Sequence, residues 1–300
     1  MRTLYSLVKR NTKLFFKDKG MFFTSIITPL ILLVLYATFL GNVYRDSFET
    51  TLGAFGITAP EELIAGCVSG QLFSSLLAVS CVTVAFCSNL LMVQDKVNGS
   101  RYDLTVSPVK TPVLSFSYYI STAIATLIVS LIATAACLIY VAAVGWFLSF
   151  ADILLIIGDV ILLVLFGTAL SGLINIFLSS QGQISAVGTI VSAGYGFICG
   201  AYMPLSQFSD GLRNALAFLP GTYGTSLLRN HALRGVFEEM ESEGYPTVAI
   251  DTVRDIIDCN IYFFDEKVPM WVMYAVLCVA VALLFFAYVL ITVLRRKAKR

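Results

Sequence analysis

The chain has few charges, a single histidine and no phosphate-binding loop. Asp, Glu, Lys and Arg make up 13% of its 300 residues. No Gly-x-x-x-x-Gly-Lys-Ser/Thr segment occurs, so the chain cannot itself cradle nucleotide phosphates in the P-loop manner. The one histidine, His231, excludes a His-Glu-x-x-His zinc site and any metal cluster with two histidines. We interpret His231 as a surface or interface residue, and we expect the chain to hold no metal and not to be an enzyme.

Long uncharged runs take up most of the sequence instead. They cover residues 20–44, 63–94, 111–151, 160–209 and 268–294, and hydrophobic residues make up 58% of the chain. A helix that crosses a bilayer needs about 20 apolar residues, so these runs indicate an integral membrane protein. The run at 160–209 is too long for one helix, and the polar segment 179–183 divides it. We therefore predict an all-α fold with six transmembrane helices, near 21–41, 66–94, 113–144, 152–178, 184–203 and 268–294.

Basic residues gather at both ends of the chain. The first 19 residues carry six Lys or Arg against one acid, and the last six residues carry five. The 95–112 loop has three basic residues against two acids, whereas 42–65 has one against four. Short loops rich in Lys and Arg face the cytoplasm, so we place both termini and the 95–112 loop there. The first apolar run is too long for a signal-peptide core, and we expect it to stay as an anchor.

The seven cysteines carry little functional information. Six fall in predicted spans, where cysteine is usually a small packing residue. The seventh, Cys259, lies in the 204–267 segment, which this topology places outside. It has no partner there for an internal disulfide, and we expect an impermeant thiol reagent to label it on intact cells. The six in spans are Cys67, Cys81, Cys87, Cys137, Cys199 and Cys278.

The segment before the first span separates apolar and basic side chains at helical spacing. This separation predicts a helix in the membrane interface, with its apolar face at the acyl boundary and its bases toward anionic headgroups. A plain positive-inside anchor is the alternative. The apolar side consists of Leu4, Leu7, Val8, Leu14 and Phe15, and the basic side of Lys9, Lys13 and Lys17 with Arg10 beside them.

The 95–109 loop joins the second and third predicted spans. It has mixed charge, Gly99 for a turn and Pro108 to start or stop a helix, which suits a short helix at the membrane surface.

Polar residues inside the spans leave several roles open. Asp152 is expected at the outer interface, and Asp159 lies about two turns deeper, where it could serve an ion-coupled carrier. In span two, Gln71, Ser74 and Ser75 either line a pathway or form hydrogen bonds between helices. In span five, a small residue at every fourth position suits close packing within one subunit, a subunit interface or a hinge. These residues are Gly188, Ser192, Gly196 and Gly200.

The 204–267 segment is expected on the outer face. Apolar residues at helical spacing predict two short amphipathic helices that lie on the membrane or cap a pore. The first has Leu212, Leu216 and Leu219, and the second has Ala249, Val253, Ile256 and Ile257. Between them, Glu238, Glu239, Glu241 and Glu243 are interpreted as a solvated acidic face.

Taken in order along the chain, these features resemble the transmembrane subunit of type 2 ATP-binding-cassette exporters. The resemblance covers essentially the whole chain. Members of that family more often carry Glu, Thr and Glu where this chain has Asp95, Ser100 and Asp103. The matching positions are the basic amphipathic start, then Asp95, Lys96, Gly99, Ser100 and Asp103, then Ser107-Pro108-Val109, Gly200-Ala201-Tyr202-Met203-Pro204, Leu219-Pro220 with Tyr223, and Leu228-Arg229.

The resemblance implies a half-transporter in a bacterial plasma membrane. Two such permeases would pair, as a homodimer or a heterodimer, and two separate P-loop ATPase subunits would bind ATP and Mg²⁺ for them. It implies that residues 4–17 and 95–109 touch the ATPase and that 204–267 forms an outer gate. No nucleic-acid partner is expected. The whole chain would be one permease domain, with an interfacial helix at 1–19, spans at 20–203, the outer segment at 204–267, a last span at 268–294 and a basic tail at 295–300.

The expected activity is outward movement of an amphipathic substrate by alternating access. The nearly neutral spans, with polar groups limited mainly to Ser, Thr and Gln, suit a drug, antibiotic, peptide or lipid-like molecule. Two alternatives stay open, namely export of a polysaccharide or teichoic acid and ion-coupled transport through Asp159.

Overall fold

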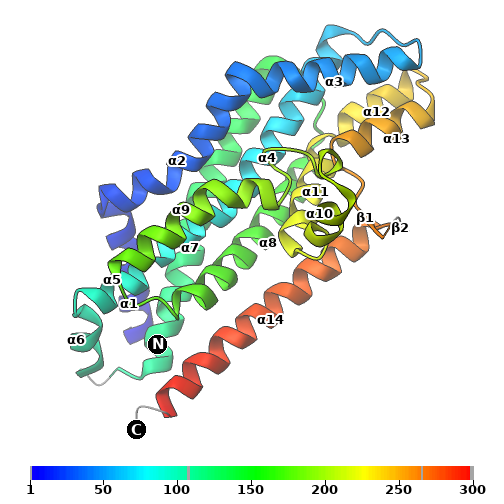
Figure 1. Cartoon of the computed structure of the whole chain (residues 1–300). Helices are drawn as coiled ribbons and strands as arrows, with labels where there is room; N and C mark the ends of the chain where they lie inside the picture. The colour runs from blue at the N-terminus through cyan, green and yellow to red at the C-terminus, as the bar shows by residue number, and fades with distance from the viewer. Residues whose placement is uncertain (1, 107–108, 265, 298–300) are drawn as a thin grey trace.

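Long helices run along one axis of the molecule, and the two chain ends lie together at one end of it (Figure 1). The structure, a computed structural model, describes residues 2–106, 109–264 and 266–297. The first elements are α1 (Arg2–Lys17), α2 (Lys19–Leu35), the π-helix η1 (Tyr36–Leu40) and α3 (Gly41–Ala54). They are followed by α4 (Glu61–Asn89), α5 (Leu91–Val97), α6 (Ser100–Val106), α7 (Thr111–Val144), α8 (Phe150–Asn175) and α9 (Gln181–Ile198). The rest comprises the 3₁₀ turn η2 (Leu205–Gln207), α10 (Asp210–Leu216), α11 (Pro220–Ala232), α12 (Arg234–Ser242), α13 (Thr247–Ile256), the hairpin of β1 (Tyr262–Phe263) and β2 (Glu266–Lys267), and α14 (Met270–Lys297).

Polar residues start two of the long helices at defined positions. Ser149 accepts a hydrogen bond from the backbone N–H of Asp152 at 3.2 Å, and the Asp152 carboxylate accepts one from the Ser149 N–H at 2.9 Å. This reciprocal capping box satisfies backbone donors that a helix start leaves unpaired. Ser180 and Gln183 form the same box at the start of α9. The predicted division of the 160–209 run is thus confirmed, with α8 and α9 as separate helices.

The α4 helix lies at the centre of the bundle. Its apolar window is 94% buried, against 22% for α7 and 11% for α14. It packs against α2, α7, α8, α9 and α11, which surround it on all sides. A helix that is apolar all round is suited to a buried position, whereas the outward faces of α7 and α14 carry the exposed apolar side chains that lipid would cover.

Five helices in the described part of the chain are long and apolar enough to cross a membrane. They are Lys19–Ala54, Glu61–Val97, Pro112–Val144, Phe150–Asn175 and Met270–Arg295. The all-α membrane fold is therefore confirmed. The predicted fifth span corresponds to α9, which is not among the five. It has 18 residues, so it extends only about 27 Å, and glycine, serine and glutamine lower its hydropathy.

The first long helix extends well beyond the span predicted for it. The sequence places its end near residue 41, but α2, η1 and α3 continue as one helix to Ala54. At 36 residues it is about 54 Å long, which exceeds a hydrocarbon core of about 30 Å. The α3 part carries charged residues and packs on α4 and α13, at the end of the molecule opposite the termini (Figure 1).

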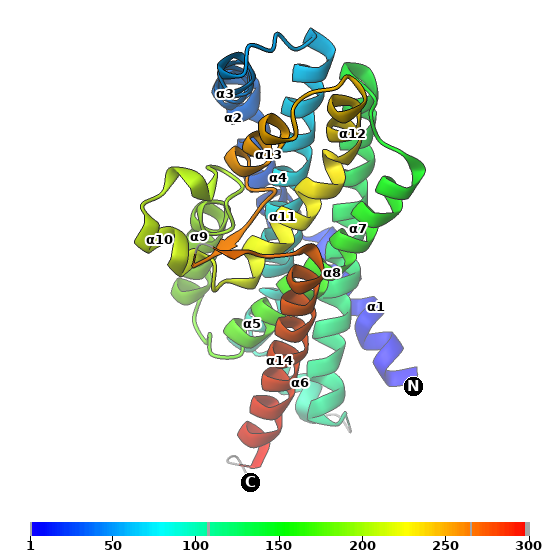
Figure 2. The ribbon, with the colours of Figure 1, turned by 90° about the vertical axis from the view of Figure 1, so that its right-hand side faces the viewer.

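The segment at 204–267 forms a cap at that opposite end (Figure 2). Two amphipathic helices are predicted there, and the structure has four, with α10 and α13 at the predicted places. The sequence does not predict α11, which inserts against α4, α8 and α14 and is buried over most of its length. Small residues, including Gly221 and Gly224, give α11 a narrow outline that fits between the larger helices.

Two predicted surface residues are buried in the cap. Cys259 is 1% exposed, and burial raises the pKa of its thiol to about 12. The expectation that an impermeant reagent labels it is therefore wrong, because neither access nor the thiolate is available. His231, interpreted as a surface or interface residue, lies on the buried face of α11. The acidic residues of α12 do form an exposed face, where Glu238 pairs with Arg234 at 2.8 Å.

Candidate functional site

The end of the molecule that carries the termini holds a charged junction between α1, α5 and α7. Asp95 on α5 is nearly buried and accepts two hydrogen bonds from Arg10, from Nη1 at 2.8 Å and Nη2 at 3.1 Å. It also accepts one from the Tyr118 hydroxyl at 2.5 Å. The hydrogen bond to Asp95 raises the pKa of the Arg10 guanidinium above its ordinary value. A bidentate pair of this kind fixes orientation as well as distance, so α5 is held rigidly against α1 and α7.

The neighbouring Lys96 connects α5 to the end of α8. Its Nζ donates to the carbonyl oxygens of Asn175 at 3.0 Å, Ile176 at 3.1 Å and Leu178 at 3.1 Å. These carbonyls have no partner within α8 because they belong to its last turn and the residues after it. A cation at this position also complements the negative end of the helix dipole. Asp95 and Lys96 together tie α5 to α1, α7 and α8.

Beyond this junction, α6 projects from the bundle (Figure 1). Gly99 has φ +78°, a left-handed conformation that turns the chain sharply between α5 and α6. The expected short helix is present and begins at Ser100. Asp103 is exposed, and Tyr102 and Val106 are 72% and 69% exposed. The predicted Ser107 and Pro108 lie outside the described residues. An exposed helix with aromatic and apolar side chains, held on a rigid base, has the properties of a docking surface.

The N-terminal helix separates its faces as predicted, but the apolar face has a different neighbour. Leu7 and Phe15 are buried against α7 and adjacent helices, and only part of that face remains for lipid. The apolar face that the sequence predicts for the acyl boundary is therefore covered by protein at these two positions. The basic face is open to solvent and consists of Lys9, Lys13 and Lys17, while Arg10 turns inward to Asp95.

A second polar cluster joins α4 to the cap. Arg229 on α11 is 1% exposed, and it donates to the Gly200 carbonyl, to Ser75 at 3.4 Å and to Asp258 at 3.3 Å. Asp258 also accepts hydrogen bonds from the backbone N–H groups of Leu205 at 2.5 Å and of Ser206 at 3.3 Å. Burial raises the pKa of the Asp258 carboxyl to about 6, and the nearby Arg229 cation offsets this only in part.

The polar residues predicted for span two lie at this cluster or directly beside it. Gln71, Ser74 and Ser75 are each at most 1% exposed. The Ser74 hydroxyl donates to the carbonyls of Gly70 and Gln71 in its own helix, and Ser75 accepts from Arg229. In this conformation the three residues are closed off from solvent.

Asp159, the deeper carboxylate of α8, pairs with two residues that the sequence did not connect to it. Its Oδ2 lies 2.6 Å from Nδ1 of His231, and its Oδ1 accepts a hydrogen bond from the Tyr274 hydroxyl at 2.7 Å. The three groups link α8, α11 and α14 at a buried position. No sequence signal announced this cluster, because its members lie on three segments separated by tens of residues.

The row of small residues on α9 divides between two environments. Gly188 and Ser192 line a groove of about 600 Å³ between α2 and α9, whose base includes Cys87 and Gln94. Gly196 is covered by the ring of Tyr202, and Gly200 has φ +74° at the turn after the helix. Hydroxyl groups from both helices face the groove among apolar side chains, at Thr24, Thr28, Ser185, Thr189 and Ser192.

Comparison with known proteins identifies the family. The family model described as ABC-2 type transporter matches residues 2–232, which is more than half of the chain. No curated protein sequence matches the chain. The match includes α1, the α5–α6 junction, α9 and α11, whereas Asp258 and Tyr274 lie beyond its end. The chain belongs to the ABC-2 type transporter family and is a multi-pass membrane permease subunit of an ABC transporter.

Proposed function

We propose that the chain is the membrane subunit of an ATP-driven exporter of a bacterial plasma membrane. Both termini and α6 lie in the cytoplasm, and the cap lies outside. The chain crosses the membrane six times, with α9 as a short fifth span that ends at Ile198. The basic ends and the acid-rich cap at opposite ends of the molecule support this orientation.

The observation that carries the proposal is the position of α6. It projects from the bundle, yet the Asp95 and Lys96 contacts connect its base to three other helices. A force applied to α6 by a partner would reach α1, α7 and α8 without passing through a flexible linker. ATP and Mg²⁺ bind the partner, a P-loop ATPase subunit, and this chain converts its movement into alternating access.

We propose two roles for the groove between α2 and α9. It contacts a second permease subunit, and the substrate passes along the interface between the two subunits. Its hydroxyl groups and apolar walls suit an amphipathic molecule such as a drug, antibiotic, peptide or lipid-like compound. A polysaccharide or teichoic acid is the alternative cargo. The absence of charged side chains from the groove apart from Asp18 favours the amphipathic substrate over a polyanion.

Docking of the ATPase on α6 is tested by co-purification of this chain with its ATPase subunit. Asp103→Lys reverses an exposed charge on α6 and is expected to lower recovery of the ATPase several-fold, while the permease still inserts. Glu239→Lys, an equal change on exposed α12 at the opposite end, is the control and should leave recovery unchanged. Equal recovery with both variants would contradict this docking site.

The buried contact between Asp159 and His231 supports a second candidate, ion-coupled transport. A carrier carboxylate must change its charge in each cycle, so Asp159→Asn would abolish transport. If the cluster is structural, the amide keeps the shape and some of the hydrogen bonds, and transport per folded molecule persists. We expect the second result, measured as efflux in membranes that contain matched amounts of the two proteins.

A further inference from the structure

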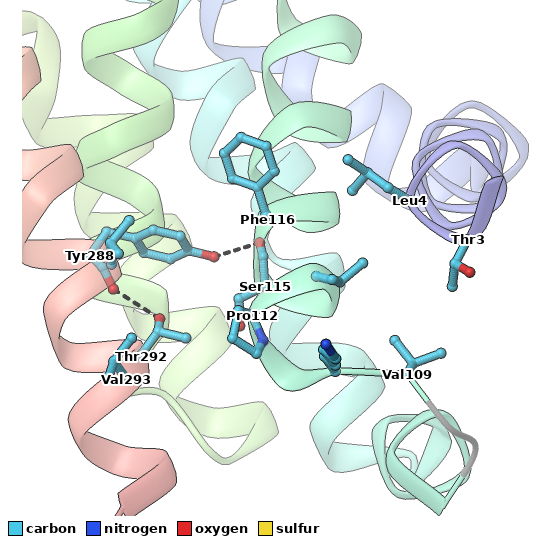
Figure 3. A pocket seen from close by; sticks show the side chains of 12 residues that line it. Thr3, Leu4, Val109, Pro112, Ser115, Phe116, Tyr288, Thr292 and Val293 are labelled. Atoms are coloured by element: carbon cyan, nitrogen blue, oxygen red, sulfur yellow. Dashed lines mark hydrogen bonds between the residues drawn. The ribbon is translucent and has the colours of Figure 1, made fainter. Parts of the chain in front are cut away.

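A groove of about 560 Å³ opens where the starts of α1 and α7 meet the last turns of α14. Figure 3 shows Leu4 from α1, Pro112 and Phe116 from α7, and Tyr288 and Val293 from α14 around it. It lies near the chain ends and is separate from the α2–α9 groove, with which it shares no lining residue. We call it the inner groove.

Its walls are mostly apolar, and the hydroxyl groups of Tyr288 and Thr292 are engaged in hydrogen bonds. The Tyr288 hydroxyl donates to the backbone carbonyl of Ser115 at 2.7 Å, and the Thr292 hydroxyl donates to the carbonyl of Tyr288 at 2.8 Å (Figure 3). Phe116 and Val289 are each 40% exposed beside the groove, on faces that lipid would cover. Apolar side chains gain dispersion energy when other apolar atoms contact them. A hydrocarbon chain would supply such contacts along this wall and is therefore the favoured occupant.

The rim of the groove is positively charged. Lys110 is one of its lining residues, and Arg101 lies on α6, the helix that directly precedes the lining residues Val109 and Lys110 in the chain. Within the described residues, neither cation has an ion-pair partner. Asp95, the nearly buried acid of the neighbouring junction, is already paired with Arg10.

We propose that the inner groove binds an anionic phospholipid from the cytoplasmic leaflet. One acyl chain lies along α7 and α14, and the phosphate lies at Lys110 and Arg101. A basic pocket between membrane helices on the cytoplasmic side is a known arrangement for anionic headgroups. The same charges disfavour a cationic amphiphile as the occupant. The assignment to the cytoplasmic leaflet rests on the orientation proposed above, whereas the anionic selectivity rests on the groove itself.

A tryptophan placed in the groove can report which lipid occupies it. The chain has two tryptophans, Trp146 and Trp271. In the reporter variant, both are first replaced by phenylalanine. Phe116→Trp then provides the only signal. The protein is reconstituted in symmetric vesicles that contain brominated phosphatidylglycerol or brominated phosphatidylcholine, each diluted in unbrominated lipid. Quenching is expected to show about a fivefold preference for the anionic lipid, the effect of roughly one basic residue near a membrane surface.

Charge variants separate a built site from ordinary surrounding lipid. Lys110→Glu should remove most of the preference, and Lys110→Gln should lower it without reversing the charge. Lys19→Glu, at an exposed lysine outside the groove, is the matched control and should keep it. Equal quenching by the two lipids, or an unchanged preference in both Lys110 variants, would overturn the proposal. Symmetric vesicles require neither transport nor a fixed orientation of the protein. The lipid preference can therefore be absent while the exporter function is correct, and it can be present while the exporter function is wrong.

Discussion

The buried pair of Arg229 and Asp258 fixes the point where α9 gives way to the cap. Arg229 contacts the Gly200 carbonyl at the end of α9, and Asp258 contacts the backbone of η2, so the two side chains hold three separate segments together. Charges at 1% and 6% exposure are costly to bury unless their hydrogen-bonding groups are satisfied. The pair therefore acts as a connection whose loss should release the cap.

The raised pKa of Asp258 predicts a specific dependence of stability on pH. The folded protein holds the carboxyl proton with a pKa of about 6, against an ordinary value of 3.8. Between these values the folded state binds more protons than the unfolded state, so the contribution of Asp258 falls as pH rises through the window. Asp258→Asn removes this titration. The melting temperature of the wild type should therefore fall relative to the variant between about pH 4 and pH 6, by the equivalent of up to roughly 3 kcal/mol.

Above about pH 7 the two melting curves should shift in parallel, because Asp258 is then fully ionised. Thermal unfolding in one detergent across the pH range provides the measurement, and Asp251→Asn, at an exposed carboxylate of the same cap, is the control. A difference that grows in favour of the wild type as pH rises would contradict the assignment.

Single residues were the least predictable part of the molecule. Arg229 and Gly200 could be selected by motif, but Asp258 is one of many acids in its segment and has no distinguishing spacing. The sequence places His231 at a surface or interface and Cys259 on the accessible outer face, because neither lies in a predicted span. Burial of such residues depends on how α11 inserts between other helices, which is a long-range property that local patterns do not contain.

At the scale of elements, α9 combines two surfaces in one row of small residues. The half near its start faces the α2–α9 groove, and the half near its end is filled by Tyr202 folding back on it. The Tyr202 N–H also donates to the Gly196 carbonyl at 3.0 Å, so the chain reverses tightly at this point. Of the alternatives that the sequence leaves open, close packing within the subunit applies at Gly196, while Gly188 and Ser192 line the groove.

Substitution of adjacent glycines on α9 should separate the filled surface from the open one. A Cβ at Gly196 would overlap the Tyr202 ring, whereas at Gly194 nothing lies within 4 Å. Gly196→Ala is expected to destabilise the protein by about 1–3 kcal/mol through overpacking. Gly194→Ala should be neutral or slightly stabilising. Thermal unfolding of the two purified variants measures the difference, and equal melting temperatures would mean that Tyr202 does not occupy this position.

Most of the long elements followed from the sequence, because length and hydropathy define a membrane helix almost by themselves. The breaks at 179–183 and near Gly145 were also visible, since polar and glycine residues end helices. The continuation of the first helix through η1 to Ala54 was not predicted. A charged helix outside the membrane is stabilised by packing on α4 and α13, and no hydrophobic run marks it.

At the scale of the whole molecule, the two ends differ in charge and in the elements that they carry. The end with the termini is basic and carries α6, and the opposite end carries the cap (Figure 2). The α4 helix, which runs between them in the centre of the bundle, contacts elements at both ends. A movement at α6 is therefore connected to the cap through one buried helix.

Cysteine labelling can test the proposed orientation at introduced thiols, because Cys259 is buried and is not a suitable site. In a background with the exposed Cys278 replaced by alanine, Glu239→Cys on α12 and Asp103→Cys on α6 place thiols at exposed positions at opposite ends. An impermeant maleimide should label Glu239→Cys on intact cells and Asp103→Cys only after permeabilisation. The reverse pattern would invert the topology.

Coupling of ATP hydrolysis to transport through α6 is tested most directly at Gly99. Valine there must adopt φ +78°, at a cost of about 1–3 kcal/mol, so Gly99→Val should displace α6. Asparagine tolerates this conformation, so Gly99→Asn should retain activity, and Gly158→Val, at an open position on α8, is the matched control. In proteoliposomes with the ATPase subunit, the account predicts that Gly99→Val inserts normally but loses ATP-dependent transport, while the other two variants keep it. Full transport driven by a proton gradient without any ATPase, or undiminished ATP-dependent transport by Gly99→Val, would contradict it.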